Sequence, residues 1–276
     1  MALPIHPRHE SKRGLIVRHC SHAQLFGARA RRWLYNYGGE LSSWGRKEWT
    51  TDPACRSLSS TFEFVPMVAD LGAIDHAHFS PRSKHLLGMN EPAEFKNESA
   101  KAVAKRWSQV EALADRGFTP RLRLGTPAPG GLDLKKGERW LASFFEHCRE
   151  CHIDMLALHW YECDGSTQAA AEASARSMLG WLHAMHLRYH KPIWLTEFNC
   201  GDGAAPQPFA NQSAANHIRF MQAALPLLDA AAFVHRYSWF QAWQRHTPTH
   251  PGHNPGCSLL DLGGGRLSDL GVLYNT

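Results

Sequence analysis

Residues 155–198 read MLALHWYECDGSTQAAAEASARSMLGWLHAMHLRYHKPIWLTEF, a long amphipathic segment between two short apolar runs. The runs Met155–Leu158 and Ile193–Thr196 are almost wholly apolar, as expected of parallel strands that are covered on both faces. The apolar residues between them recur three or four positions apart, which is typical of one face of a helix: Met178, Leu179, Leu182 and Met185. The stretch therefore predicts a β–α–β unit with parallel strands and a right-handed crossover.

The same alternation continues in both directions along the chain. Eight apolar runs are predicted as strands: Gly14–Val17, Trp33–Tyr35, Thr61–Met67, His85–Met89, Arg121–Leu124, Met155–Leu158, Ile193–Thr196 and Phe233–Tyr237. Helical spacing recurs around Trp107, Leu141 and Leu225, whereas residues 38–60 and 74–83 show no clear helical period. The sequence therefore predicts an α/β protein with a single (β/α)₈ TIM barrel, whose helices are shortened or irregular in the first half.

The length and composition fit one domain of this kind. The chain has 276 residues, and we expect residues 1–12 to form an N-terminal tail and residues 13–276 to form the barrel domain. Hydrophobic residues make up 43% and charged residues 20%, which excludes a mainly disordered chain. The net charge of +5 is spread along the chain, which argues against a nucleic-acid partner. No apolar run approaches the roughly 18 residues that a membrane span requires.

Two glutamates directly follow predicted strands, at the carboxyl ends where barrel enzymes have their active sites. Glu91 lies in GMNEP (residues 88–92) after the fourth strand, and Glu197 lies in LTEF (residues 195–198) after the seventh. Either motif alone is compatible with a turn or a solvated residue, because the residue before a proline prefers extended geometry. Together they supply the two carboxyl groups, one protonated and one ionised, that hydrolysis of a glycosidic bond requires.

Six short motifs, taken in their order along the chain, carry a family resemblance. They are WLYNY (33–37), FVPM (64–67), LGMNEP (87–92), LHWY (158–161), LTEF (195–198) and YSWF (237–240). In this order they resemble glycoside hydrolase family 128, a group of clan A β-1,3-glucanases. The similarity extends from about Arg13 to the C-terminus, and it implies an irregular (β/α)₈ barrel with a retaining mechanism.

The resemblance assigns roles to four residues of these motifs. It implies that Glu91 is the general acid/base, that Glu197 is the nucleophile, and that Asn90 binds the sugar 2-hydroxyl. Tyr161 would hold the nucleophile carboxylate in place. The sequence departs from the family pattern at Tyr37, where a tryptophan is frequent, and this puts one wall of the cleft in doubt.

The resemblance also implies that further residues bind the substrate along the cleft. Those within the motifs are Tyr35, Asn36, His159, Trp160 and Trp239. Sugar rings stack on aromatic faces, so two tryptophans of nearby loops are added, although each is equally compatible with packing at the barrel mouth: Trp44 and Trp243.

The expected function is a retaining endo-β-1,3-glucanase that hydrolyses laminarin- or curdlan-type β-1,3-glucan by double displacement. Retention requires the two carboxyl groups to lie about 5–5.5 Å apart, whereas inversion requires a wider gap. We expect no cofactor or metal, a β-1,3-glucan oligo- or polysaccharide as the partner, and a monomeric chain. The alternatives are another clan A β-glucanase specificity, a non-catalytic β-glucan-binding protein and, more distantly, a metal-dependent hydrolase.

The sequence and the expected substrate give opposing indications of the native compartment. Residues 1–14 are polar and lack the central apolar stretch of a secretory signal. The expected substrate, by contrast, favours an extracellular or periplasmic location.

The cysteines and histidines offer two further sites for interpretation. Seven cysteines are an odd number at scattered spacings, so we expect most of them to be reduced. The run CRECH (148–152) matches the pattern for covalent haem attachment, but it has no obvious haem pocket, and a local zinc site is the other option. The loop after the eighth strand has spacings that would suit a structural zinc, a substrate contact or a plain loop: His246, His250, His253 and Cys257.

Overall fold

The computed structural model describes residues 10–27, 31–41, 53–58, 62–79, 82–201, 212–242 and 255–276. The strands are β1 (Glu10–Ile16), β2 (Arg31–Tyr35), β3 (Phe62–Phe64), β4 (His85–Leu86), β5 (Arg123–Leu124), β6 (Leu156–Trp160), β7 (Ile193–Phe198) and β8 (Val234–Trp239). The helices are α1 (Cys20–Gln24), α2 (Pro53–Leu58), η2 (Gly72–His76), α3 (Ala100–Asp115), α4 (Leu134–His147), α5 (Gln168–Tyr189), α6 (Ala214–Ala230), η3 (Pro255–Cys257) and α7 (Asp269–Tyr274). Strands and helices alternate in sequence, as predicted.

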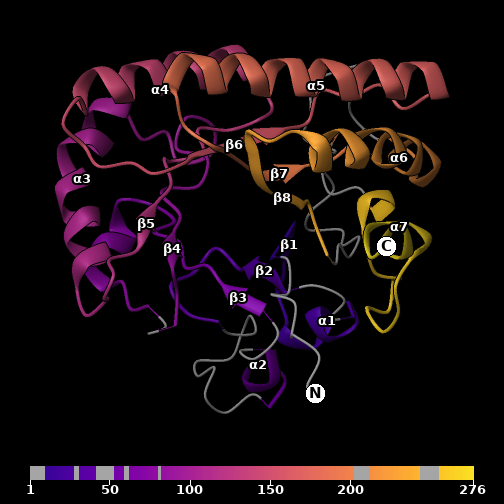
Figure 1. Cartoon of the computed structure of the whole chain (residues 1–276), viewed down its shortest axis with the longest axis horizontal. Helices are drawn as coiled ribbons and strands as arrows, with labels where there is room; N and C mark the ends of the chain where they lie inside the picture. Colours follow the sequence, from indigo (N-terminus) through magenta and orange to yellow (C-terminus); the bar gives the residue numbers. More distant parts are fainter. Residues whose placement is uncertain are drawn as a thin grey trace, which may run out of the picture.

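The strands are parallel to their neighbours and follow one another around a barrel. One sheet has the order β3–β2–β1–β8–β7–β6, and a second sheet pairs β4 with β5. Single parallel bridges connect the two sheets, one between Met67 and Leu87 and the other between Gly125 and Met155. Figure 1 shows the strands at the centre and the long helices α3 to α6 outside them. The predicted (β/α)₈ barrel is confirmed, although single bridges rather than continuous ladders connect β4 and β5 to the strands beside them.

The helices of the first half are short, which confirms the expected irregularity. Helices α1 and α2 have 5 and 6 residues and η2 is a five-residue 3₁₀ turn, whereas α3 to α6 have 14 to 22 residues. Each of the long helices begins after a Ser, Thr or Asp whose side chain accepts a hydrogen bond from an amide of the first turn: Ser99, Asp133, Thr167 and Ser213. Strand β1 begins at Glu10, three residues before the expected domain boundary, and α7 was not predicted.

Apolar side chains form two layers, one inside the barrel and one between the strands and the helices. On β6, Leu156, Leu158 and Trp160 belong to the outer layer, whereas Ala157 belongs to the inner one. Alternate residues of a strand point to opposite faces. The layer to which a side chain belongs therefore shows whether it faces the barrel interior or the helices.

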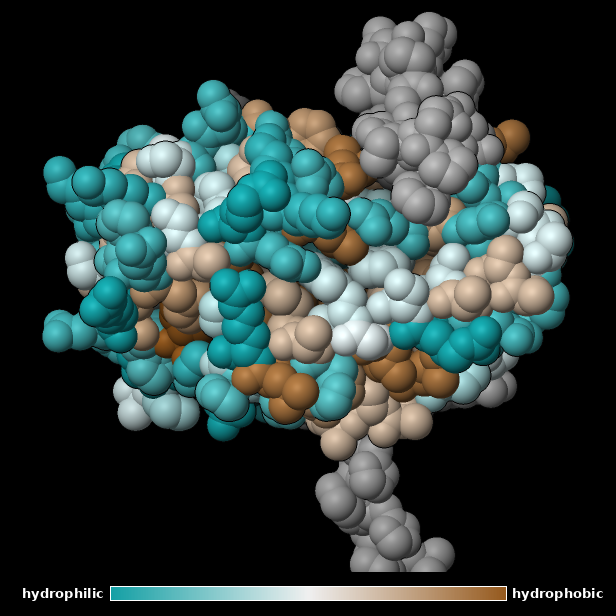
Figure 2. Space-filling model, turned by 90° about the horizontal axis from the view of Figure 1, so that it is seen from above, coloured by the Kyte–Doolittle hydropathy of each residue, from teal (hydrophilic) through white to brown (hydrophobic). Residues whose placement is uncertain are grey.

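Few large apolar side chains are exposed in the described part of the chain. Figure 2 shows one face on which hydrophobic residues lie in small, separate patches. In the described ranges, the large apolar side chains that are exposed are Phe95, Leu187, Leu262 and Val272. Within the same part of the chain, no helix combines the length and the apolar character needed to cross a membrane.

A buried ionic group lies toward the amino-terminal ends of the strands, inside the barrel. Arg236 Nη2 donates to Glu63 Oε2 at 2.6 Å, and His85 Nδ1 lies 2.6 Å from Glu63 Oε1. The Arg236 guanidinium also stacks 4.4 Å from the ring centre of Trp194. Burial opposes ionisation of Glu63, but the contacts with His85 and Arg236 outweigh it and lower the pKa of Glu63 to about 2.

The prediction that most cysteines are reduced is wrong. Disulfide bonds join Cys20 to Cys55, Cys148 to Cys151 and Cys163 to Cys200, and Cys257 is buried and takes part in none of these three bonds. Two of these pairs are 35 and 37 residues apart in sequence, and the fold brings them together from neighbouring barrel units. Because both sulfurs of CRECH (148–152) are bonded to each other, neither haem attachment nor zinc binding is retained for that run.

The disulfides are expected to stabilise the barrel unequally. Replacing both Cys163 and Cys200 by serine should lower the free energy of unfolding by about 4 kcal/mol, because the bond closes a long loop of the unfolded chain. The corresponding double replacement of Cys148 and Cys151 opens a far shorter loop and should cost about 2 kcal/mol. Urea unfolding without reductant measures both losses, and equal losses would contradict this ranking.

Candidate active site

Glu91 follows β4 in a turn that the next barrel unit holds in place. Its backbone N–H donates to the carbonyl of Ala128 at 2.8 Å, and a parallel bridge pairs Asn90 with the same residue. The Glu91 backbone has a φ of 50°, in the left-handed region that residues other than glycine rarely adopt. The side chain is 7% exposed. The carboxyl group is therefore fixed at the end of β4, largely shielded from water.

Glu197 points into the barrel because β7 carries an irregularity. The register with β8 shifts between Leu195 and Phe198, and both of these side chains pack in the outer layer. Strict alternation would place a single inward residue between two outward ones. Here two residues, Thr196 and Glu197, lie between the outward Leu195 and Phe198. The extra residue turns Glu197 inward, as β-bulges near active sites commonly do. Its side chain is 2% exposed.

Two phenols donate hydrogen bonds to the Glu197 carboxylate, one to each oxygen. Tyr161, which follows β6, donates to Oε2. Tyr37, which follows β2, donates to Oε1 at 2.9 Å. Hydrogen bonds to an ionised carboxylate stabilise its charged form and fix its orientation.

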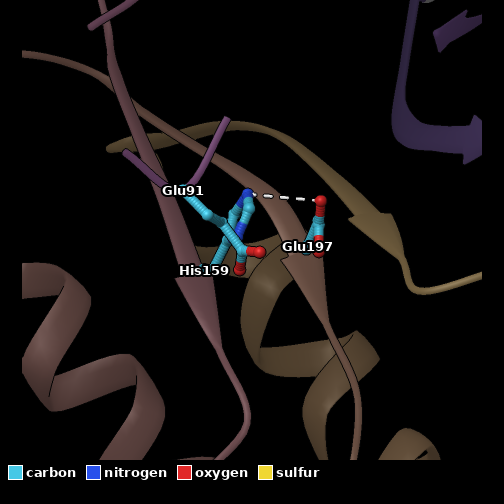
Figure 3. A group of neighbouring side chains, drawn as sticks. All are labelled: Glu91, His159 and Glu197. Carbon is cyan, nitrogen blue, oxygen red and sulfur yellow. Dashed lines mark hydrogen bonds and ion pairs between the residues drawn. The ribbon is translucent and has the colours of Figure 1, made fainter. Parts of the chain in front are cut away.

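His159 of β6 lies between the two glutamates and is completely buried. Its Nδ1 is 2.9 Å from Glu91 Oε1 and its Nε2 is 3.6 Å from Glu197 Oε1. Figure 3 shows the imidazole beside Glu91 and marks its contact with Glu197. Burial opposes charging of His159, but the nearby Glu197 and Glu91 outweigh it and raise the pKa of the imidazole.

The electrostatics of Glu197 reflect opposing influences. Burial raises the pKa of Glu197, and the neighbouring Glu91 carboxyl adds to this effect. His159 and the hydrogen bonds from Tyr161 and Tyr37 act in the opposite direction, toward the ionised form. Burial outweighs these three groups, so the pKa of Glu197 lies above its ordinary value, and the three groups limit how far it rises.

The same cluster also has the spacing of a metal site. One ligand atom from each of Glu91, His159 and Glu197 lies within 4.8 Å of the others. The imidazole Nδ1 contacts Glu91, and both oxygens of Glu197 accept hydrogen bonds from phenols. His159 Nε2, by contrast, has no hydrogen-bond partner among the described residues. The three side chains thus form a buried cluster of titratable groups whose carboxylate oxygens on Glu197 are already engaged by protein donors.

The structure places three further predicted residues beside this cluster. Asn90 directly precedes Glu91, and its buried Oδ1 accepts no hydrogen bond from the described residues. The Tyr35 hydroxyl donates to the carbonyl of Thr196, next to Glu197. Asn36 stabilises the turn that follows β2, since its side chain accepts from the amide of Gly38.

Two predicted sugar-stacking residues are corrected, because their side chains face the helices. Trp160 packs against Trp181 of α5 with ring centres 5.6 Å apart. Trp239 is fully buried, packs on Phe198, and donates its indole N–H to the carbonyl of Cys257. Both indoles belong to the outer layer, so neither presents a face to the barrel mouth.

Sequence reasoning missed two aromatic residues of the site. Phe240 is half-buried, packs against the inner layer and meets the Tyr161 ring edge-to-face at 5.9 Å. Tyr37 had been noted only as a departure from a family pattern. Strand alternation was the available signal, because Tyr37 follows the inward residue Tyr35 by two positions and Phe240 follows Arg236 by four. Other predicted residues lie outside the described part of the chain: Trp44, Trp243, His246, His250 and His253.

Comparisons with known proteins agree with this geometry. A family model described as "Glycosyl hydrolase catalytic core" matches residues 20–274. "Alkali-sensitive linkage protein 1" of Schizosaccharomyces pombe is 29% identical over 248 residues, covering 88% of this chain but only 39% of the relative.

Two solved structures are similar over almost the whole chain. One is a subgroup II endo-β-1,3-glucanase of glycoside hydrolase family 128 from Sorangium cellulosum, with 27% identity, a TM-score of 0.73, and coverage of 96% of this chain and 98% of the other. The other is a subgroup I endo-β-1,3-glucanase from Amycolatopsis mediterranei in complex with laminarihexaose, with 26% identity, a TM-score of 0.68, and coverage of 98% and 99%. The chain therefore belongs to the family of the glycosyl hydrolase catalytic core, and its resemblance to glycoside hydrolase family 128 is confirmed.

Proposed function

We propose that the protein is a retaining β-1,3-glucanase in which Glu91 is the general acid/base and Glu197 is the nucleophile. The observation that carries this proposal is the close approach of the two carboxyl groups, with an oxygen of each within 4.8 Å of the other. Retaining glycosidases have carboxyl groups about 5–5.5 Å apart, whereas inverting enzymes need about 6.5–9.5 Å to admit a water molecule. The arrangement therefore supports double displacement.

The hydrogen bonds of the two glutamates support different roles. Glu197 accepts hydrogen bonds from two phenols, which suits a carboxylate that must stay ionised to attack carbon. Glu91 contacts Nδ1 of His159, a ring nitrogen that can donate or accept a hydrogen bond according to the protonation of the ring. Only the second environment suits a carboxyl group that changes its protonation state in each half of the reaction.

The two steps follow from these roles. In the first, Glu91 gives its proton to the glycosidic oxygen while a Glu197 oxygen bonds to the anomeric carbon and the leaving sugar departs. In the second, Glu91 takes a proton from water, the water oxygen attacks the same carbon, and the bond to Glu197 breaks. In both steps Asn90 is proposed to accept a hydrogen bond from a sugar hydroxyl, and the lack of any partner for its Oδ1 among the described residues supports this role. No cofactor takes part in either step.

The substrate is proposed from the relatives. The two similar structures are named endo-β-1,3-glucanases, and one of them holds laminarihexaose. We infer that this chain cleaves β-1,3-glucan internally. Its disulfides further suggest an oxidising compartment, because such bonds rarely persist in the cytosol.

The test is to incubate the protein with laminarin, curdlan and cellulose oligomers, with and without a chelator. We expect cleavage of the first two only, unaffected by the chelator, with products of several sizes appearing together from the start. Release of glucose alone would contradict internal cleavage. A first-formed product of α configuration, observed by proton NMR, would contradict retention.

Phe240 is expected to be the aromatic platform for a sugar at the cleavage point. Replacing Phe240 by alanine should lower kcat/KM on laminarin about 10–100-fold with little loss of thermal stability, because the ring is half-buried beside Tyr161. The comparison variant is Trp239→Phe, which should lower the melting temperature but leave KM nearly unchanged, because Trp239 packs against the helices. The opposite pattern in the two variants would restore the stacking role first expected of Trp239.

A further inference from the structure

Tyr37 has a backbone conformation that its residue type disfavours. Its φ is 64°, in the left-handed region that bulky side chains rarely adopt outside strained positions. Of the described residues other than glycine, only Glu91, Asn97 and His190 share a positive φ. Strain of this kind persists where the surrounding structure imposes it, and it is concentrated at functional sites. In Tyr37 it accompanies a side chain that reaches back over the barrel mouth to Glu197.

The contact that this conformation makes is specific. The Tyr37 hydroxyl donates to Glu197 Oε1 at 2.9 Å, while Tyr161, which follows β6, donates to Oε2. Burial and the charge of Glu197 raise the pKa of the Tyr37 phenol, so it remains a proton donor throughout the working pH range. The Tyr37 ring also packs edge-to-face on Tyr35 at 5.2 Å, which fixes its position.

Glu197 needs such a donor because it is so deeply buried. The groups that face it are His159, Glu91, Tyr161, Tyr37 and Tyr35. Burial and Glu91 favour the neutral carboxyl group, which cannot attack an anomeric carbon. Of the groups that act in the opposite direction, His159 lies 3.6 Å away, so the two phenols are the direct hydrogen-bond donors.

We propose that Tyr37 is a positioning residue of the reaction, whose hydrogen bond favours the ionised form of Glu197 and fixes the plane of that carboxylate. The inference rests on the proposed function of Glu197 as the nucleophile. With one phenol on each oxygen, the carboxylate cannot rotate about its terminal bond without breaking a hydrogen bond. Tyr37, which follows β2, thereby orients one oxygen of the carboxylate, and Tyr161, which follows β6, orients the other.

The test is Tyr37→Phe, which keeps the ring and removes only the donor. Removal of a donor to the ionised form makes protonation easier, so the titration midpoint of Glu197 should move to higher pH by about one unit. Protein labelled with ¹³C at the glutamate carboxyls reports this midpoint by NMR, and a Glu197→Gln sample assigns the signal. The acid limb of kcat/KM should move in the same direction, with kcat reduced more than KM is raised.

The matched control is Tyr237→Phe. Tyr237 is another buried tyrosine that donates to a carboxylate, that of Asp229, but it faces the helices. This variant should lose stability without any shift of the Glu197 midpoint. A midpoint in Tyr37→Phe equal to that of the parent would overturn the proposal, as would an equal shift in both variants.

The titration needs no substrate, which separates this inference from the proposed function. The midpoint of Glu197 can shift in Tyr37→Phe even if the parent protein does not cleave β-1,3-glucan. That combination would refute the glucanase assignment and still support the effect of Tyr37 on Glu197. Turnover of laminarin with no shift in Tyr37→Phe would leave the glucanase assignment standing and refute the role of Tyr37.

Discussion

Replacing Glu197 by alanine is expected to lower kcat/KM on laminarin by about 10⁴-fold or more, because no other group can form the covalent intermediate. Glu91→Ala should cost about 10²–10⁴-fold, the usual contribution of a positioned general acid. The loss in Glu91→Ala should be smallest for a substrate with an activated leaving group, such as a nitrophenyl β-laminaribioside, whose departure needs little protonation. Initial rates on both substrates measure the two effects.

Added azide distinguishes the two roles by the stereochemistry of its product. In Glu197→Ala the small anion occupies the space of the missing carboxylate and attacks the substrate directly, which gives an α-glycosyl azide. In Glu91→Ala it attacks the glycosyl-enzyme already formed on Glu197, which gives a β-glycosyl azide. Proton NMR of the anomeric signal identifies each product. Interchanged products would mean that the two roles are reversed.

The matched control for these variants is Glu162→Gln. Glu162 is another glutamate at a strand end, immediately after Tyr161, but its carboxylate accepts a hydrogen bond from the backbone of Leu134 at the start of α4. Turnover should stay within a few-fold of the parent. Activity that survives replacement of both Glu91 and Glu197 would end the two-carboxylate assignment.

Chemistry rather than periodicity located the proposed nucleophile in the sequence. Trp194 faces the barrel interior, so simple alternation along β7 would send Glu197 outward with Leu195. The strand irregularity between Leu195 and Phe198 turns Glu197 inward instead. No residue type in that run predicts the irregularity. Glu197 was found because a carboxylate after an apolar run in a barrel strand is expected at the active site.

For the aromatic residues of the site, by contrast, strand periodicity is a better guide than residue type. Trp160 and Trp239 were selected by residue type, although alternation from their neighbours points both indoles toward the helices. Applied consistently, the same alternation selects Tyr37 and Phe240. The local pattern was therefore sufficient for these side chains, and the preference for tryptophan misled the prediction.

Other features depend on contacts that local sequence does not encode. The partners of Cys20–Cys55 and Cys163–Cys200 lie 35 and 37 residues apart and meet only when neighbouring barrel units pack. The strands β4 and β5, with two residues each, are ordered by single bridges to their neighbours rather than by long apolar runs. By contrast, the long helices α3 to α6 followed directly from their apolar spacing.

Replacing Arg236 by methionine is expected to be the most destabilising single change in the barrel interior. It leaves Glu63 buried with His85 as its remaining direct partner, and removing one member of a buried ion pair typically costs about 3–5 kcal/mol. Urea unfolding at pH 7 measures the loss. The comparison variant is Arg176→Met, which breaks an exposed pair with Glu172 on α5 and should change stability very little.

The dependence on pH identifies Glu63 as the cause of that loss. The pKa of Glu63 is lowered from an ordinary value of 4.5 to about 2 in the folded protein, so its contribution to stability is complete above about pH 4.5 and is lost as the pH falls toward 2. Without Arg236 this depression should be weaker. The stability difference between parent and Arg236→Met should therefore shrink steadily as the pH falls below 4.5. A difference that stays the same down to pH 2.5 would attribute the loss to packing against Trp194 instead of to the ion pair.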